Sequence, residues 1–171
     1  MPLILTGVGS RETDQLGMER MAKIAKVFSK KGFILRSGGA KGADSAFEDN
    51  WKGEKEIYLP WNGYEGKYIS KGYIVPVITT EHEALAASAH PAWERCSPGA
   101  RKMHSRNTCQ VLGVHLDTPA TLLVCWTVNG EYRGGTAVAM RIADMYNIPI
   151  YNLGAPDGLE RLRAYHASLT A

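Results

Sequence analysis

Short apolar runs alternate along the chain with longer segments in which apolar residues recur every three or four positions. The short runs predict buried strands, and the periodic segments predict helices that cover them. Strands are predicted at residues 3–6, 33–36, 55–59, 120–127 and 149–152, with a further extended segment at 74–78. Helices are predicted at 17–31, 43–51, 80–89, 98–116, 135–146 and 159–169, and Thr80 with Glu83 predicts a capping box for the third of them.

This alternation of strands and helices predicts the fold class. Parallel strands joined by helical crossovers form a sheet that is covered on both faces. We therefore expect an α/β fold, a three-layer, Rossmann-like, doubly wound and mostly parallel sheet in a single domain over residues 1–171. Ligands of such sheets bind beyond the carboxyl ends of the strands, where the strand order switches.

The amino-acid composition indicates the general class of protein but does not identify a ligand. The 171 residues are 44% hydrophobic and 22% charged, as in an ordinary globular protein, and the net charge of +3 permits a polyanionic partner without indicating one. No apolar stretch is long enough to span a membrane. The three cysteines predict reduced thiols, and neither they nor the five histidines show the spacing of a metal site, so we expect no metal or cofactor.

The most informative motif is the segment Ser37-Gly38-Gly39-Ala40-Lys41-Gly42-Ala43-Asp44, between a predicted strand and a predicted helix. Glycines allow close approach of the backbone, and the amides at a helix N-terminus bind anions. Lys41 would add a point charge on a phosphate, whereas Asp44 is expected to cap the helix or hold the loop. The predicted phosphate-binding residues here are Ser37, Gly38, Gly39, Lys41, Gly42 and Asp44.

Two further glycine turns follow the same logic. One follows the first strand and contains Gly9, Ser10 and Arg11, whose guanidinium would pair with a phosphate. The other, Gly134-Gly135-Thr136, opens a late helix. The first of these could instead be a plain tight turn with an exposed arginine, but three glycine turns in one small chain suggest a nucleotide or nucleic-acid ligand.

Polar side chains elsewhere suit the rest of such a ligand. Arg106, Asn107 and Gln110 share one helical face with Met103. This face either lines a pocket for a base or sugar or is simply solvated. Thr127 could bind a phosphate or ribose.

Two features of the loops leave alternatives open. Glu131 is either a loop residue, a ligand of a ribose hydroxyl, or a general base. The aromatic residues Trp61, Tyr64 and Tyr68 lie in a glycine-rich loop, and would either stack on bases or pack as a lid or dimer contact.

The Gly7–Arg11 turn, the 37–44 loop and the pair Arg106-Asn107 together resemble the Rossmann-like core of DNA-processing protein A, the DprA or Smf family. More broadly the chain is similar to the SLOG superfamily, which includes the LOG phosphoribohydrolases, and its compact form resembles proteins carried by bacteriophages. The resemblance spans about residues 3–152. Full-length DNA-processing proteins usually add a helical or winged-helix domain, and we expect these 171 residues to contain none.

The resemblance to the hydrolases is partial. Met103-His104-Ser105-Arg106 is similar to their Met-His-x-Arg motif, but Ala139 occupies the position of their glutamate. The resemblance therefore implies binding of a nucleotide-derived small molecule or of single-stranded DNA. One alternative is an enzyme that cleaves a nucleoside 5′-monophosphate, with Arg106 and Glu131 as its catalytic groups. A second is a phage protein that sequesters a host signalling nucleotide. A third is a protein that keeps the fold but has lost its ligand.

The same resemblance implies the setting of the protein. We expect a homodimer or homotetramer without a membrane partner. The expected location is the cytoplasm of a bacterium or of a phage-infected host.

Overall fold

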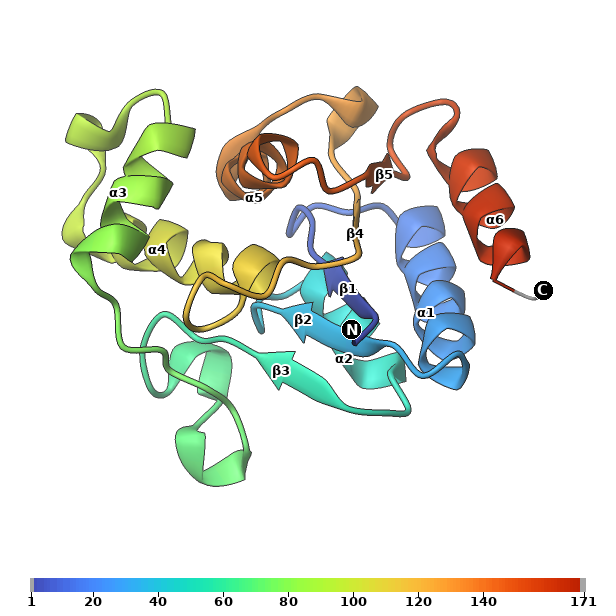
Figure 1. The fold of residues 1–171 in the computed structure, drawn as a ribbon, viewed down its shortest axis with the longest axis horizontal. Helices are drawn as coiled ribbons and strands as arrows, with labels where there is room; N and C mark the ends of the chain where they lie inside the picture. The colour runs from blue at the N-terminus through green and yellow to red at the C-terminus, as the bar shows by residue number, and fades with distance from the viewer. Residues whose placement is uncertain (1, 170–171) are drawn as a thin grey trace.

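Five parallel strands form one sheet in the order β3-β2-β1-β4-β5 (Figure 1). The computed structural model describes residues 2–169. Its strands are β1 (Ile4–Gly7), β2 (Ile34–Ser37), β3 (Lys55–Ile57), β4 (Leu122–Cys125) and β5 (Ile150–Asn152). β1 is central, since Leu5 pairs with Leu35 on one side and with Leu122 on the other.

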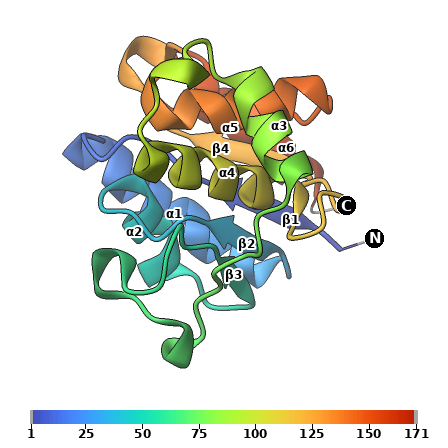
Figure 2. The same ribbon diagram turned by 90° about the vertical axis from the view of Figure 1, so that its left-hand side faces the viewer.

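Helices cover both faces of this sheet. They are α1 (Gln15–Lys30), α2 (Ala43–Asn50), α3 (Thr80–Ala89), α4 (Pro98–Leu112), α5 (Gly134–Met145) and α6 (Gly158–Ser168). Helices α1 and α2 pack on one another, and α6 packs on β5. On the other side α3, α4 and α5 contact one another, and Figure 2 shows this group facing the viewer. The predicted three-layer, single-domain α/β fold is confirmed.

Two apolar cores follow from this layering. Side chains of successive strand residues point to opposite faces of a sheet. In β4, Leu122 and Val124 accordingly join the core beneath α1 and α2, which contains Phe28 and Phe47. Leu123 and Cys125 join the other core, with buried residues of α4 and α5. All four residues of β4 are buried, which explains why this strand has no polar alternation.

Most predicted elements are present, with corrections at their ends. The helix predicted over 98–116 stops at Leu112, because Gly113 adopts φ 83°, outside the helical range. The Gly113 amide still donates the last helical hydrogen bond, to the Cys109 carbonyl at 2.8 Å. The predicted strand 120–127 pairs only over its central part, as β4. Segment 74–78 contributes a single bridge, from Ile74 to Tyr58.

The start of α3 differs from its prediction. The capping box is formed by Thr79 and the side chain of His82, not by Thr80 and Glu83. The His82 ring also contacts the Val114 carbonyl at 2.9 Å, so a histidine can replace the usual glutamate where it is held from a second side.

The strand order places a switch point at β1. The chain runs outward from β1 to β2 and β3, and then returns to pair β4 with the opposite edge of β1. Connections leave β1 and β4 in different directions there, which opens a crevice beyond their carboxyl ends. None of the helices among residues 2–169 is long and apolar enough to cross a membrane.

Candidate functional site

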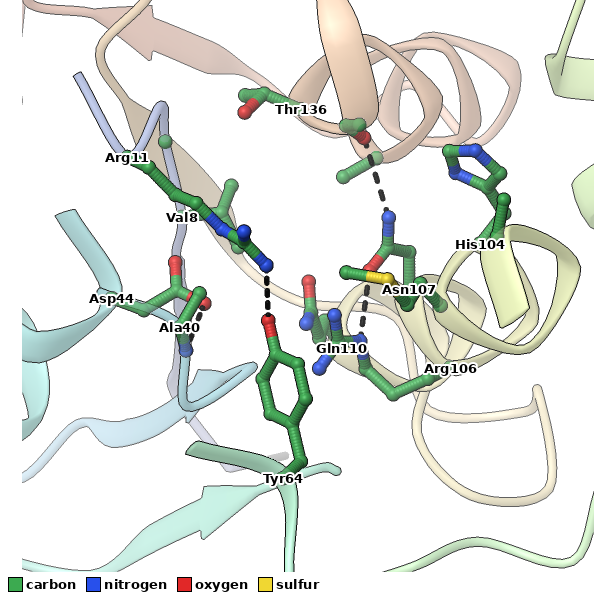
Figure 3. A pocket seen from close by; sticks show the side chains of 15 residues that line it. Val8, Arg11, Ala40, Asp44, Tyr64, His104, Arg106, Asn107, Gln110 and Thr136 are labelled. Atoms are coloured by element: carbon green, nitrogen blue, oxygen red, sulfur yellow. Dashed lines mark hydrogen bonds between the residues drawn. The ribbon is translucent and has the colours of Figure 1, made fainter. Parts of the chain in front are cut away.

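A cavity of about 390 Å³ lies at this switch point (Figure 3). Its walls come from the loops after β1 and β2, from the segment after β3, from one face of α4 and from the first turn of α5. The three glycine turns and the α4 face predicted from the sequence therefore meet in space. The predicted site residues that line the cavity are Gly9, Arg11, Asp44, Arg106, Asn107, Gly135 and Thr136.

Arg11 reaches the cavity from the loop after β1. Its Nη2 donates a hydrogen bond to the Tyr64 hydroxyl at 2.9 Å (Figure 3). Tyr64 is buried, and Trp61 packs edge-on against its ring with the centroids 5.5 Å apart. The partner of the Arg11 guanidinium is thus a neutral phenol, so the arginine keeps its capacity to bind an anion.

Arg106 is a buried cation that connects α4 to two strand ends. Its Nη1 donates to the Gly38 carbonyl at 2.6 Å and to the Tyr58 carbonyl at 2.9 Å. Its Nε donates to Asn107 Oδ1 at 2.9 Å, and its Cζ lies 5.6 Å from the centroid of the Tyr64 ring. Burial lowers the pKa of Arg106, and the nearby Asp44 opposes that shift. These bonds give Arg106 a positioning role in addition to its place in the cavity wall.

Asp44 is the one carboxylate among the described residues lining this cavity. It lies in the first turn of α2, and its Oδ2 accepts a hydrogen bond from the Ala40 amide at 3.2 Å. Burial raises the pKa of Asp44 to about 6, against the opposing effects of Arg106 and of the Ala40 and Gly38 amides. The side chain therefore holds the glycine loop through the Ala40 amide, which is one of the two structural roles expected of it.

The glycines of this loop are explained in large part by packing inside the protein. A Cβ atom at Gly38 would lie 2.2 Å from Gln110 Nε2 and 2.9 Å from Asp44 Oδ2. Gly42 has φ 83°, and a Cβ there would lie 2.8 Å from the Ser10 carbonyl oxygen. Among the cavity-lining residues, the 37–44 loop contributes Ala40 and Asp44. The glycines of this loop thus allow its backbone to lie close to α4 and to the glycine turn that follows β1.

The first turn of α5 supplies a different kind of anion-binding group. No side chain among the described residues caps this 12-residue helix, whose N-cap residue is Arg133. Uncapped amides and the positive end of the helix dipole favour anions. Gly135 and Thr136 line the cavity, and Asn107 Nδ2 donates to the Gly135 carbonyl at 3.3 Å. The helix start is therefore fixed against α4 and faces the same space as Arg11.

Several predicted residues lie outside the cavity wall. The Ser37 hydroxyl donates to the Gly7 carbonyl at 2.6 Å, and Thr127 Oγ1 accepts from Asn152 Nδ2 at 2.7 Å, so both hydroxyls are used between elements of the fold. Lys41 is exposed, with its Nζ 3.9 Å from Glu65. Ser10, Gly38, Gly39 and Gly42 are not among the described residues that line the cavity, and Gly134 lines a neighbouring cavity.

The catalytic alternative loses its proposed base. Glu131 is exposed, pairs with Arg133 at 3.8 Å and does not line the cavity. Ala139, at the position of the hydrolase glutamate, does line it. The cavity therefore presents a methyl group where that resemblance would require a carboxylate.

Sequence reasoning missed two parts of the site. Tyr64 was one of three loop aromatics with an open role, and only its place beneath Arg11 shows that it belongs to the wall. His104 lines the cavity as well. Burial, His90 and Arg106 together lower the pKa of His104 to about 4, so its imidazole is neutral at physiological pH. The Met-His-x-Arg motif was the one sequence signal for this residue.

Comparisons with known proteins support the fold. No protein-family model matches the chain, and a search of curated proteins finds no significant match. Among solved structures, DNA processing protein A from Helicobacter pylori, described for its single-stranded DNA binding mode, is 18% identical with a TM-score of 0.59. The match covers 96% of this chain and 73% of that one.

Two further structures are similar. DNA processing protein A (DprA) from Streptococcus pneumoniae is 16% identical with a TM-score of 0.55, over 96% of this chain and 56% of that one. The molybdenum cofactor carrier protein from Chlamydomonas reinhardtii is 18% identical with a TM-score of 0.49, over 99% and 88%. At these identities the two DNA processing proteins show that the fold is shared, as the sequence motifs predicted.

Proposed function

We propose that this chain binds a small nucleotide-derived ligand in the cavity beyond β1 and β4. The observation that carries the proposal is the convergence of Arg11 and the uncapped first turn of α5 on one cavity at the switch point of the sheet. A volume of about 390 Å³ falls in the range of small-molecule sites, which is about 300–1,000 Å³.

The walls suggest how such a ligand would lie. Its phosphate would sit between the Arg11 guanidinium and the amides of Gly135 and Thr136, where both the cation and the helix dipole favour negative charge. Its base or sugar would lie along α4, where Met103 offers an apolar contact and Asn107 an amide. Mixed apolar walls with a few polar groups are typical of sites for such ligands.

A calorimetric titration tests this proposal. The panel would contain AMP, ADP, ADP-ribose and a cyclic nucleotide, together with adenosine as the ligand that lacks phosphate. We expect saturable binding of at least one phosphorylated member and much weaker binding of adenosine. Failure of every phosphorylated member to bind would contradict the proposal.

Single-stranded DNA is the second candidate, favoured by the fold shared with the Helicobacter pylori protein. An oligonucleotide would be held chiefly through its phosphates, so its affinity should fall steeply as salt rises. A fluorescent oligonucleotide titrated at several salt concentrations measures this slope. Tight oligonucleotide binding that AMP fails to displace would favour DNA over a small nucleotide.

A further inference from the structure

A second set of ligating groups lies beside the cavity, at the junction of α3 and α4. His90 follows the last residue of α3, Cys96 precedes α4, and His104 lies within α4. One potential ligand atom from each of the three lies within 4.8 Å of the other two. Helices α3 and α4 pack side by side, which brings together residues whose linear spacing has no metal pattern (Figure 2).

The separation between Cys96 and His90 suits a tetrahedral ion. Zinc binds thiolate sulfur at about 2.3 Å and imidazole nitrogen at about 2.0–2.1 Å, so a tetrahedral site separates the two by about 3.5 Å. Cys96 Sγ lies 3.6 Å from His90 Nε2. The rings of His90 and His104 have centroids 4.6 Å apart and are tilted by 57°, so they are neighbours without being stacked face to face.

The side chains also have capacity for a ligand. His104 Nδ1 is buried and has no hydrogen-bond partner within the described structure, which is unfavourable unless something else satisfies it. Cys96 is a half-buried free thiol, whereas Cys109 and Cys125 are buried in the protein interior. Thiolate and imidazole together select zinc and similar borderline ions over magnesium or calcium.

We propose that His90, Cys96 and His104 bind a divalent ion of the zinc class. Three protein ligands leave a fourth tetrahedral position, as in zinc sites that accept water or a substrate. His90 and His104 both line a second cavity of about 350 Å³, and His104 also lines the cavity beyond β1 and β4. The fourth position would therefore be reached from a cavity that adjoins the proposed phosphate site. This inference does not depend on the identity of the nucleotide.

Metal binding should alter one local contact. His90 Nδ1 accepts a hydrogen bond from the Ala92 amide at 3.0 Å. Coordination through Nε2 requires the proton on Nδ1, which then no longer accepts from that amide. The Ala92 amide should therefore show one of the larger changes in the nitrogen–proton NMR spectrum when zinc is added.

Cobalt titration of the full chain, stripped of metal with a chelator, tests the site directly. We expect one equivalent of Co²⁺ to give the absorption of tetrahedral cobalt with a thiolate charge-transfer band, and Zn²⁺ to displace it. Cys96→Ser should abolish that band and weaken binding by about tenfold or more, while His115→Ala, an exposed histidine outside the cluster, should leave both unchanged. No saturable band, or the same band in Cys96→Ser, would overturn the proposal.

Alkylation of the unaltered protein keeps the test decisive if Cys96→Ser fails to fold. Iodoacetamide should modify Cys96 first, because the other two thiols are buried. One equivalent of Zn²⁺ should slow that reaction by about tenfold, since a coordinated thiolate is a poorer nucleophile, and peptide mass spectrometry identifies the modified residue. An unchanged rate with zinc present would count against the site.

Discussion

The Tyr64 hydroxyl accepts a hydrogen bond from Arg11 Nη2 at 2.9 Å, and both residues line the cavity. The bond joins a cation on the loop after β1 to a buried phenol that follows β3. A neutral acceptor holds the guanidinium more weakly than a carboxylate or phosphate would. Arg11 is thus positioned over the cavity by a contact that an anionic ligand can replace.

Replacing Arg11 by alanine should weaken nucleotide binding strongly. A charge-assisted hydrogen bond contributes about 1.5–3 kcal/mol, so Arg11→Ala should raise the Kd by about 10- to 100-fold. Calorimetry with the tightest phosphorylated ligand measures the change. Arg163→Ala removes an exposed arginine of α6 outside the cavity and is the matched control. Equal losses in the two variants would mean that binding depends only on net charge.

Removing the Tyr64 hydroxyl should leave the affinity for the nucleotide unchanged or raise it slightly. Tyr64→Phe keeps the ring that packs on Trp61 and lies beside Arg106, but removes the acceptor that competes for Arg11. We expect a Kd equal to that of the unaltered protein or a few-fold lower, since the phosphate no longer displaces a hydrogen bond. A tenfold loss of affinity would instead show that the hydroxyl itself contacts the ligand.

The fold could be predicted from sequence because its signals are local. Apolar runs and helical periods fixed the strands and helices, and their alternation implied the parallel sheet. Errors fell at element ends, where tertiary contacts decide. Gly113 ended α4 early, and His82 took the capping role expected of Glu83, because the Val114 carbonyl holds its ring.

The site was predicted less completely because side-chain partners are long-range. The 37–44 loop was expected to supply the phosphate cradle, yet Gly38 packs against the side chain of Gln110, which is 72 positions away. Ser37 and Thr127 carry hydroxyls suited to a ligand, but both bond to other parts of the fold. Proximity of His90, Cys96 and His104 likewise depends on the packing of α3 against α4, which no linear spacing encodes.

The packing explanation for Gly38 makes a direct prediction. Gly38→Ala should destabilise the protein by about 1–3 kcal/mol, because the added methyl group meets Gln110, Asp44 and Arg106 within 3.0 Å. Urea unfolding measures the loss. Gly99→Ala is the control. Gly99 lies in the first turn of α4, and a Cβ atom there would meet nothing within 4 Å. Helix propensity should make that variant equally stable or up to about 1 kcal/mol more stable. If Gly38→Ala is as stable as the unaltered protein, packing does not explain this glycine, and contact with a ligand becomes the better explanation.

The buried carboxyl of Asp44 should make stability depend on pH in a specific direction. Its pKa rises from 3.8 in a solvated chain to about 6 in the fold, chiefly through burial. Between these two values the folded protein binds more protons than the unfolded chain, so the free energy of unfolding falls as pH rises through this window. The shift corresponds to about 3 kcal/mol, fully lost above pH of about 6.

Asp44→Asn isolates that contribution. The asparagine carbonyl can still accept from the Ala40 amide, but the side chain no longer ionises. Relative to the unaltered protein, the variant should therefore gain about 3 kcal/mol of stability between pH 4 and pH 7, measured by urea unfolding at several pH values. Asp49→Asn, which changes an exposed carboxylate on the same helix, is the matched control. Parallel stability curves for Asp44→Asn and the unaltered protein would mean that Arg106 and the loop amides keep Asp44 ionised, and that the loop carries a permanent negative charge beside the cavity.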